Sequence, residues 1–350
     1  MIKINSDATC TLPYTRYLFE QDALKFPLGN HIYQTFKDRG LKAAFLQSHN
    51  RVTGIPGKTQ AQAFVQGKNT LVIGVRKGLE FASCKPSAHF QLPLVTGCPG
   101  MCQYCYLNTN LGKKPYTRLY VNVDEILHKT ESYIKARQPE ITVFEASATA
   151  DPVPVEHISG ALFRAIVFFA GQEFGRLRLA TKFPCPESIL SAEHRGHTRI
   201  RYSLNTPAII ARYERRTPSL NERLDALGEV IKRGYPPGIL LAPVFLEDGW
   251  EHEYLELLHL LKERLGLLTS AELHFEIISH RFTKRARQVI DQVFSGNQLP
   301  MDEEKGRRFK YGQFGYGKYI YTPDRLEEMK SFFSTNLPAL FPQSVIEYMI

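Results

Sequence analysis

The chain has 350 residues, with 44 Lys and Arg against 35 Asp and Glu, so its formal charge is 44 − 35 = +9. Hydrophobic residues make up 43% and charged residues 23%, an ordinary globular composition that excludes a disordered chain. No run of about 18 apolar residues occurs, which excludes a membrane-spanning helix. Because the first residues also lack the pattern of a secretory signal, we expect a soluble protein in the cytoplasm. The basic charge permits a nucleic-acid partner without requiring one.

The predicted elements become regular about a quarter of the way along the chain. A helix is predicted over residues 21–39 and a strand over 70–75, within Thr70-Leu-Val-Ile-Gly-Val75. From there strands alternate with helices. The later strands are predicted at residues 90–96, 141–146, 177–183, 198–204, 239–244 and 272–278. The helices between them are predicted at residues 123–137, 155–174, 220–233 and 250–265, and Ser219 with Glu222 forms a capping box for the third.

Six strands that alternate with helices predict a parallel sheet, either a partial (β/α) barrel or an open doubly wound sheet. In both folds the active-site residues lie on loops at the C-terminal ends of the strands. After residue 281 the pattern changes to a basic helix, a charged loop, an aromatic-glycine segment and a last helix from about residue 324.

Three of the six cysteines fall within eight residues, in Thr96-Gly97-Cys98-Pro99-Gly100-Met101-Cys102-Gln103-Tyr104-Cys105-Tyr106. Clustered thiols are typical of metal or redox chemistry rather than of a disulfide framework. Three thiolates can hold a four-iron cluster and leave one iron open. A structural zinc site normally needs four ligands, and the fourth would have to be Cys84 or Cys185. Cys10 and Cys185 lie outside every motif.

The spacing Cys-x-x-x-Cys-x-Tyr-Cys resembles the radical S-adenosylmethionine superfamily. The resemblance implies that a [4Fe-4S] cluster is ligated by Cys98, Cys102 and Cys105, and that its open iron binds S-adenosylmethionine. Reductive cleavage of that cofactor would give a 5′-deoxyadenosyl radical, which the protein aims at its substrate. An electron donor such as a flavodoxin or a ferredoxin is implied as well.

Longer runs resemble one family of this superfamily, spore photoproduct lyase, which repairs the methylene-bridged thymine dimer of spore DNA. The resembling runs span residues about 50 to 325. They are Thr70-Leu-Val-Ile-Gly-Val-Arg-Lys77, Lys85-Pro-Ser-Ala88, Tyr104-Cys-Tyr-Leu107, Tyr120-Val-Asn-Val123, Phe144-Glu-Ala-Ser147, Thr181-Lys-Phe183, His280-Arg-Phe-Thr-Lys284, Met301-Asp-Glu-Glu-Lys305 and Gly317-Lys-Tyr-Ile-Tyr321.

The resemblance implies a reaction and assigns roles to residues. The deoxyadenosyl radical takes hydrogen from C6 of the photoproduct, the bridging bond breaks, a thiol quenches the thymine radical, and a tyrosine relay regenerates the cofactor. Tyr106 is the relay candidate, and Tyr104 would pack beside the cofactor. The residues implied to bind the cofactor at strand ends are Ser147, Lys182, Ser203, Asn205 and Ala242. Strand-end capping is the alternative for Ser203 and for Asn205.

Two positions depart from the family. The hydrogen-donating cysteine usually stands in Phe-Glu-Ala-Ser-Cys-Thr, but here the run is Phe144-Glu-Ala-Ser-Ala-Thr149, so Ala148 offers no thiol. Cys84, in Phe81-Ala-Ser-Cys-Lys-Pro86, stands where relatives tend to carry serine. We expect Cys84 to be a relocated hydrogen donor; the alternatives are an inert small residue and a variant that binds its substrate but turns it over poorly.

The C-terminal aromatic-glycine segment predicts a hairpin that contacts DNA, because chemistry on a base requires taking it out of the stack. Arg307, Arg308, Lys310 and Lys318 would contact phosphates, while Gln313 and Phe314 would wedge into the duplex. Tyr319 and Tyr321 are expected to pack on the barrel instead. A second basic cluster is either another phosphate-contacting edge or a solvated helix face. It consists of His280, Arg281, Lys284, Arg285 and Arg287.

We therefore expect an α/β protein, a partial (β/α)6 TIM-like barrel over residues 90–290, with an N-terminal extension over 1–89. Residues 291–350 would form a DNA-contacting C-terminal β-hairpin and helix. The expected function is repair of the spore photoproduct, 5-thyminyl-5,6-dihydrothymine, to two thymines in the cytoplasm of a spore-forming bacterium. Nothing in the pattern demands a dimer, so a monomer is expected. The alternatives are another radical enzyme and a nucleic-acid-binding protein with a structural metal.

Overall fold

The computed structural model describes residues 13–49, 51–270, 272–311 and 317–350. Its internal contacts divide the chain into two compact units that differ from the three consecutive segments expected above. Unit 1 comprises Met1–Pro99, Leu111–Thr181 and Cys185–Arg199, and unit 2 comprises Gly100–Asn110, Lys182–Pro184 and Ile200–Ile350. Each unit therefore joins segments that lie far apart in the sequence.

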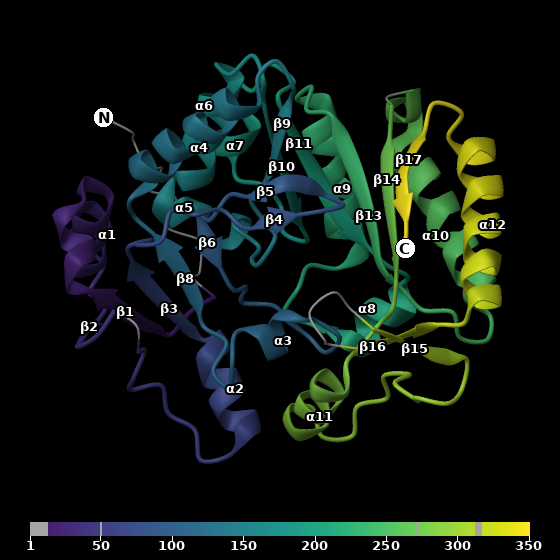
Figure 1. Cartoon of the computed structure of the whole chain (residues 1–350), viewed down its shortest axis with the longest axis horizontal. Coiled ribbons are helices and arrows are strands. Elements are labelled where there is room, and N and C mark those ends of the chain that lie inside the picture. Colours follow the sequence, from purple (N-terminus) through teal and green to yellow (C-terminus); the bar gives the residue numbers. More distant parts are fainter. Residues whose placement is uncertain (1–12, 50, 271, 312–316) are drawn as a thin grey trace. The chain divides into compact units, whose positions relative to one another are not determined.

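The N-terminal part of unit 1 forms a sheet in the order β2-β1-β3-β8-β6. Its strands are β1 (Arg16–Glu20), β2 (Ala43–Leu46), β3 (Thr70–Gly74), β6 (Val95–Thr96) and β8 (Thr117–Tyr120). Neighbouring strands are parallel except for β6, which runs antiparallel to β8. The predicted strand at residues 70–75 is confirmed as β3, and every residue of β3 is buried, as a continuous apolar run predicts for a central strand. The segment expected as an extension thus has its own parallel sheet (Figure 1).

The helices of this part differ from those that the sequence periodicity predicted. The helix predicted at residues 21–39 divides into η1 (Gln21–Lys25) and α1 (Pro27–Asp38), because Pro27 lacks an amide hydrogen and suits the first position of a new helix. A second helix, α2 (Gln60–Lys68), opens with a capping box at Thr59 and was not predicted. It leads directly into β3.

The second sheet segment of unit 1 has the order β10-β9-β5-β4. Its strands are β4 (Ser83–Cys84), β5 (Ala88–Gln91), β9 (Thr142–Glu145) and β10 (Gly175–Thr181). The strands β5, β9 and β10 are parallel, and β4 folds back antiparallel on β5. The single strand predicted at residues 90–96 is instead two strands in different sheets, β5 and β6, because Pro93 between them cannot donate to a ladder.

Helix α4 (Val123–Arg137) has the predicted bounds, whereas the helix predicted at residues 155–174 is broken. It consists of η2 (Val153–Val155), α5 (Glu156–Ser159) and α6 (Ala161–Ala170), followed further along by α7 (Glu187–Leu190). The break falls at Gly160, whose φ of 56° lies in the left-handed region that glycine adopts without strain.

Glu156 caps α6 from this break, and its burial predicts a pH-dependent stability. Its carboxylate accepts hydrogen bonds of 2.8 Å from the amides of Leu162 and Phe163, yet burial raises its pKa from 4.5 to about 7. The folded chain therefore holds this proton over a pH range in which the unfolded chain has already lost it. We expect the contribution of protonated Glu156 to the unfolding free energy to be complete below pH 4.5 and to be lost as the pH rises through about 7.

The shift of 7 − 4.5 = 2.5 units corresponds to about 3 kcal/mol of unfolding free energy. Urea unfolding between pH 5 and pH 8 measures this loss. The control variant Glu156→Gln has no proton to lose, so its unfolding free energy should be flatter over the same range. An equal slope in both proteins would show that Glu156 does not titrate as described.

Unit 2 contains a parallel sheet segment in the order β17-β14-β13-β11 (Figure 1). Its strands are β11 (Thr198–Leu204, with the first two residues in unit 1), β13 (Pro237–Val244), β14 (His274–Ser279) and β17 (Val345–Met349). The predictions for β11, β13 and β14 are confirmed within two residues. The edge strand β17 was not predicted, because its half-exposed residues lack the alternation of a one-face-buried strand.

The helices of unit 2 largely follow their predicted ranges. Those between the strands and after the hairpin are α8 (Pro207–Tyr213), α9 (Leu220–Lys232), α10 (Trp250–Leu265), η3 (Gly266–Ser270), α11 (Lys284–Val293) and α12 (Pro323–Leu340). The capping box of Ser219 and Glu222 at α9 is confirmed. Helices α10 and α12 lie against each other through Trp250, Phe332 and Phe333, with ring centroids 5.0–6.4 Å apart.

Two small antiparallel pairs complete unit 2. One joins β7 (Met101–Cys102) to β12 (Glu214–Arg215), and α3 (Leu107–Asn110) follows the cysteine loop. The other is the predicted hairpin, formed by β15 (Arg307–Tyr311) and β16 (Gly317–Tyr321). Its tip, with Gln313 and Phe314, lies outside the described residues.

No single helix within the described ranges is both long and apolar enough to cross a membrane. The pair Val153–Ser159 and Ala161–Ala170 meets the test together by length and composition, but it is bent by 93°.

Candidate active site

The first predicted cluster ligand, Cys98, is held by the backbone of unit 1. The amide of Gly97 donates to the carbonyl of Thr149 (2.8 Å), and Gly97 has a φ of 84°. A Cβ at this position would lie 2.5 Å from the carbonyl oxygen of Tyr116, so only glycine fits. The ammonium of Lys68, which is 1% exposed, donates to the carbonyl of Cys98 (3.1 Å). A buried lysine thus fixes the backbone beside this thiol.

The other two predicted ligands, Cys102 and Cys105, belong to unit 2. The buried side chain of Asn108 donates to the carbonyls of Cys102 (2.9 Å) and Gln103 (3.4 Å). The amide of Cys105 donates to the carbonyl of Cys102 (3.3 Å), which closes a tight turn. Cys102 also pairs with Glu214 in the β7–β12 ladder. The loop is therefore tied to Glu214, which is the centre of a buried ionic network with Lys182 and Arg223.

The donor set suits an iron–sulfur cluster by its chemistry. Three thiols on a short glycine-containing loop provide the ligands that such clusters use and leave one iron open. In the described part of the chain, no three His, Cys, Asp or Glu side chains are gathered as metal ligands.

Glu214 is the centre of a buried network that joins several predicted and unpredicted residues. Its Oε1 accepts from the Tyr104 hydroxyl and lies 3.4 Å from the Lys182 ammonium. Its Oε2 accepts from the guanidinium of Arg223 (2.6 Å). Lys182 also donates to the Ser203 hydroxyl (2.8 Å) and lies 5.9 Å from the centre of the Tyr104 ring. The structure thus brings together three predicted cofactor-binding residues, Tyr104, Lys182 and Ser203.

The electrostatics of this network favour a charged Glu214. Burial alone would raise the pKa of the carboxyl, but the Lys182 ammonium, the Arg223 guanidinium and the Tyr104 hydroxyl outweigh burial and hold the pKa below its ordinary value. Burial, followed by the neighbouring Glu214 charge, raises the pKa of Tyr104 well above its usual range. The phenol therefore remains a hydrogen-bond donor to the carboxylate.

Sequence reasoning missed Glu214 and Arg223, although Arg223 carried a signal. It lies on the apolar face of α9, among Leu220, Leu224 and Leu227, and is fully buried. A charge on the buried stripe of an amphipathic helix needs a partner, because an isolated buried charge is costly. Its guanidinium also donates to the carbonyls of Ser203 (3.1 Å) and Pro218 (2.9 Å).

In unit 1, a second buried carboxylate connects Ser147 to the segment that carries Cys84. Glu145 ends β9 and is 3% exposed. Its Oε1 accepts from the Ser147 hydroxyl and its Oε2 accepts from the Ser87 hydroxyl (2.8 Å). Ser147 Oγ in turn accepts from the amide of Ala180 (2.6 Å). Glu145 was also missed, because it falls inside a run identified by resemblance alone.

The same arrangement places Cys84 and Ala148 in one hydrogen-bonded framework. Cys84 lies in β4 opposite Ala88 of β5, and β5 lies beside β9. Ala148 directly follows Ser147, which shares the Glu145 carboxylate with Ser87. Of the two positions that depart from the family pattern, Cys84 therefore lies in β4 and Ala148 on the loop after β9, with β5 between these two strands of one sheet.

The remaining strand-end residues, Asn205 and Ala242, lie at the C-terminal ends of β11 and β13. The Asn205 amide donates to the carbonyl of Pro243 (2.8 Å) and its Oδ1 accepts from the Tyr254 hydroxyl (2.8 Å). Asn205 is fully buried, which fits the strand-end capping alternative. Ala242 is partly buried within β13, just before Pro243.

The structure corrects the expectation for Arg307, which cannot face a phosphate. It is 7% exposed, and its guanidinium donates to the carbonyls of His280 (2.6 Å) and Pro300 (3.1 Å). The same group lies 3.5 Å from the centre of the Tyr321 ring. Tyr319 and Tyr321 are buried, so their expected packing role is confirmed. Arg308 and Lys310 are exposed, and Lys318 is partly buried.

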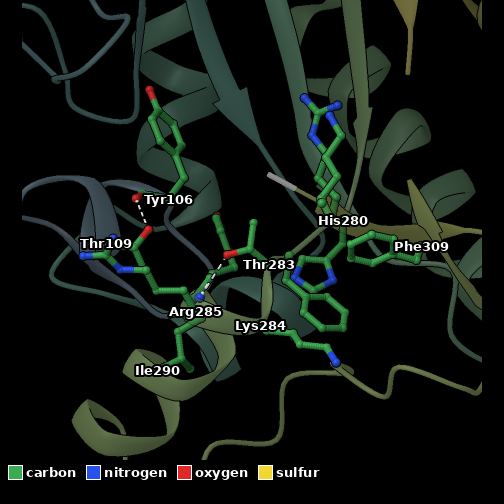
Figure 2. A pocket seen from close by; sticks show the side chains of 14 residues that line it. Tyr106, Thr109, His280, Thr283, Lys284, Arg285, Ile290 and Phe309 are labelled. Carbon is green, nitrogen blue, oxygen red and sulfur yellow. Dashed lines mark hydrogen bonds between the residues drawn. The ribbon is translucent and has the colours of Figure 1, made fainter. Parts of the chain in front are cut away.

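Tyr106 borders a pocket of about 640 Å³ in unit 2 (Figure 2). Its side chain is 53% exposed, and its carbonyl accepts from the Thr109 hydroxyl (2.9 Å). Figure 2 shows Tyr106 and Thr109 apart from the group formed by His280, Lys284 and Phe309, which closes the opposite wall. His280 and Lys284 belong to the second basic cluster, for which the sequence left a phosphate-contacting edge and a solvated helix face as alternatives.

Comparison with known proteins places these features in a family. A family model described as spore photoproduct lyase matches residues 12–350. A spore photoproduct lyase of Clostridium acetobutylicum is 48% identical over 337 residues, covering 96% of this chain and 99% of that protein. One of Bacillus subtilis is 44% identical over 329 residues, covering 94% and 96%.

Solved structures of spore photoproduct lyase have the same fold. A cysteine-to-alanine variant with dinucleoside spore photoproduct matches with a TM-score of 0.93 at 41% identity, covering 96% of this chain and 99% of that chain. A double variant that also carries a serine-to-cysteine exchange, with bound AdoMet and dinucleoside spore photoproduct, matches with a TM-score of 0.93 at 42% identity, covering 97% and 100%. The predicted mixed α/β fold with a partial barrel is thereby confirmed.

Proposed function

Because the chain belongs to the spore photoproduct lyase family, it is a radical S-adenosylmethionine lyase of DNA repair, and we propose how its own residues carry the reaction. The family match sets aside the two alternatives, another radical enzyme and a nucleic-acid-binding protein with a structural metal. The observation that carries the proposal is the link from the cysteine loop, through the β7–β12 pair, to the Lys182–Glu214 network.

Cys98, Cys102 and Cys105 would hold the [4Fe-4S] cluster, and three thiolate ligands would leave one iron available to S-adenosylmethionine. When bound, the cluster and S-adenosylmethionine supply a 5′-deoxyadenosyl radical that takes hydrogen from C6 of the photoproduct. The chain contributes a fixed backbone to this loop, through Lys68 on one side and Asn108 on the other.

Lys182 would orient the cofactor from the end of its strand. Its ammonium is held between the Ser203 hydroxyl and the Glu214 carboxylate, above the Tyr104 ring, so its position is set before any ligand arrives. A charged side chain that is already held in position loses less conformational entropy when an anionic or polar ligand binds. Ser147 and Ala242 would line the same cofactor from their strand ends, whereas Asn205 would act through the strands, by keeping β11 and β13 in register.

Cys84 would return the hydrogen that Ala148 cannot supply. The Cys84 S–H bond breaks as its hydrogen atom bonds to the thymine radical, which leaves a sulfur radical and one repaired thymine. That sulfur radical would then take the hydroxyl hydrogen of Tyr106, and the tyrosine radical would regain hydrogen from 5′-deoxyadenosine. The solved double variant supports this proposal, because its two exchanged positions are separated along the chain by as many residues as Cys84 and Ala148.

The hairpin would hold the damaged DNA. Arg308 and Lys310 are exposed on β15, and Lys310 lies directly opposite Lys318 of β16. Like charges directly opposite each other destabilise a strand pair, whereas a phosphate between them would relieve the repulsion. Gln313 and Phe314, in the tip outside the described residues, would wedge into the opened duplex.

The remaining partners follow from the reaction class. Cleavage of S-adenosylmethionine consumes one electron, so a small one-electron carrier such as a flavodoxin or a ferredoxin would supply it. The relatives come from spore-forming bacteria, which supports action on spore DNA in the cytoplasm. We propose that the chain acts as a monomer, since nothing in the sequence pattern demands a dimer.

Repair of a defined substrate tests the proposed function. Anaerobically reconstituted protein, with reductant and S-adenosylmethionine, is incubated with a synthetic spore-photoproduct dinucleotide, and thymidylyl-thymidine is followed by chromatography. We expect repair that requires S-adenosylmethionine. The control variant Cys98→Ala should show none. Protein that carries its cluster, cleaves S-adenosylmethionine and releases no repaired product would contradict the proposal.

A further inference from the structure

The pocket bordered by Tyr106 combines aromatic walls with a cationic rim. It is lined by three segments of unit 2: the loop after Cys105, the connection from β14 into α11, and the hairpin. Four cations stand on it, namely Arg281, Lys284, Arg285 and Lys318. Figure 2 shows Lys284 beside the wall formed by His280 and Phe309, whereas the side chain of Arg285 extends toward Thr109 on the other side of the pocket.

Three of the four cations have no carboxylate to neutralise them. Lys284 lies 3.3 Å from Glu303, which also faces Arg287 at 3.7 Å. Throughout the described ranges, no carboxylate lies within ion-pair distance of Arg281, Arg285 or Lys318. Burial lowers the pKa of Lys318, and the neighbouring charges of Arg281 and Lys310 lower it further. Arg281 and Lys318 therefore repel each other unless an anion joins them, and Arg285 adds a further positive charge to the lining of the pocket.

The charge pattern of α11 argues against an ordinary solvated helix face. Thr283 caps its N-terminus by accepting from the amide of Ala286 (3.0 Å), and Lys284 and Arg285 follow at once. The first turn has no acidic residue and the last turn no basic residue. This is the reverse of what the helix dipole favours, because cations at the N-terminus cost stability. The same N-terminus, with cations beside it, suits a bound phosphate.

Exposed aromatic rings supply a place for a base. Phe309 is 42% exposed and Tyr311 80% exposed, with ring centroids 4.9 Å apart. Phe309 lies across Gly317, where a Cβ would collide with its ring. Behind it, Tyr319 stacks on Phe282 with centroids 5.3 Å apart, which keeps Phe309 on a rigid base. Unstacked nucleobases bind to such exposed rings with little regard for sequence.

We propose that this pocket binds a nucleotide next to the lesion on the damaged strand, with the phosphodiesters that flank the nucleotide held by the lining cations Arg281, Lys318 and Arg285 and its base stacked on Phe309. The pocket would hold the strand beside the extruded photoproduct, so that the phosphates flanking the lesion set its approach. This inference rests on the proposed function, because it takes damaged DNA as the ligand.

Two substrates that differ in their phosphates test the proposal. One is the dinucleoside photoproduct, which has no phosphodiester, and the other is a single-stranded oligonucleotide with the same lesion at its centre. Arg285→Ala removes an exposed cation from the rim, and Arg287→Ala, on the same helix but already facing Glu303 and Asp291, is its matched control. Affinity is measured by fluorescence anisotropy over a range of salt, and turnover by chromatography.

For Arg285→Ala we expect about tenfold weaker oligonucleotide binding, with dinucleoside turnover unchanged. The slope of log affinity against log salt concentration should fall by the amount expected for the loss of about one phosphate contact. Arg287→Ala should behave as the wild-type chain. For Phe309→Leu we expect a similar loss on the oligonucleotide, and no loss when the nucleotides flanking the lesion are abasic.

Equal losses in Arg285→Ala and Arg287→Ala would overturn the proposal, as would a parallel loss on the dinucleoside. A wild-type chain that binds the oligonucleotide as expected but repairs neither substrate would contradict the proposed function and leave the pocket assignment supported.

Discussion

Replacement of Cys84 by alanine is expected to lower repair by roughly 100-fold, the scale of losing a group that the reaction requires. Cleavage of S-adenosylmethionine should continue, because Cys84 lies outside the cysteine loop, and by-products of the unquenched thymine radical should accumulate. Chromatography of thymidylyl-thymidine, by-products and 5′-deoxyadenosine measures all three. Unchanged repair would show that Cys84 is an inert residue of β4.

Two further variants separate the thiol of Cys84 from a general effect of losing a cysteine. Cys185→Ala removes a buried cysteine that lies outside the motifs and should leave repair unchanged. Ala148→Cys in the Cys84→Ala background returns a thiol to the position that the family normally uses, on the loop after β9. We expect it to restore repair, because Ser147 and Ser87 tie both positions to Glu145.

Replacement of Glu214 by alanine should remove most of the stability margin of the chain. The change leaves the buried Arg223 and the partly buried Lys182 without the Glu214 carboxylate, and breaking a buried pair in this way costs about 3–5 kcal/mol. Denaturant unfolding of the cluster-free protein measures the loss. Glu229→Ala is the control, because Glu229 pairs with Lys232 at the surface, where such a pair is worth less than about 1 kcal/mol. Similar losses in both variants would contradict the role given to the network.

The same network predicts a loss of stability in acid. The pKa of Glu214 is lower in the folded chain than its ordinary value of 4.5, so the unfolded chain binds this proton first. The contribution of ionised Glu214 to the unfolding free energy is therefore complete above pH 4.5, and it is lost as the pH falls through the pKa of Glu214 in the folded chain. It has the opposite sign to that of Glu156, so the unfolding free energy should pass through a maximum between the two ranges.

The sequence predicted the elements with strong periodicity and missed those set by contacts across the fold. α4, β11 and α10 have the predicted bounds because their apolar residues repeat with a helix or strand period and few breakers interrupt them. The broken α5–α6 segment depends on one left-handed glycine, and the separation of β5 from β6 depends on one proline. β17 exists because β14 presents an edge to it, which no local pattern encodes.

The residues of the candidate site could be predicted only where they form a recognisable sequence motif. The thiol spacing and the residues at strand ends could be recognised in the sequence, whereas Glu214 and Glu145 act through partners far away in the chain, Tyr104 and Ser87. Arg307 shows the opposite failure. It reads as a surface cation beside Arg308, but the hairpin register turns it inward onto Tyr321. Burial, and not residue type, decides which of two neighbouring arginines is available to a phosphate.

Transfer of solvent deuterium into the repaired thymine tests the central claim, that Cys84 returns the hydrogen, most directly. A thiol exchanges its hydrogen with water, so a reaction in D2O should place one deuterium in the methyl group of one product thymine. Mass spectrometry of thymidylyl-thymidine from the wild-type chain should show this label, and residual product from Cys84→Ala should lack it. Unlabelled product from the wild-type chain, or equal label from Cys84→Ala, would show that the hydrogen comes from another donor.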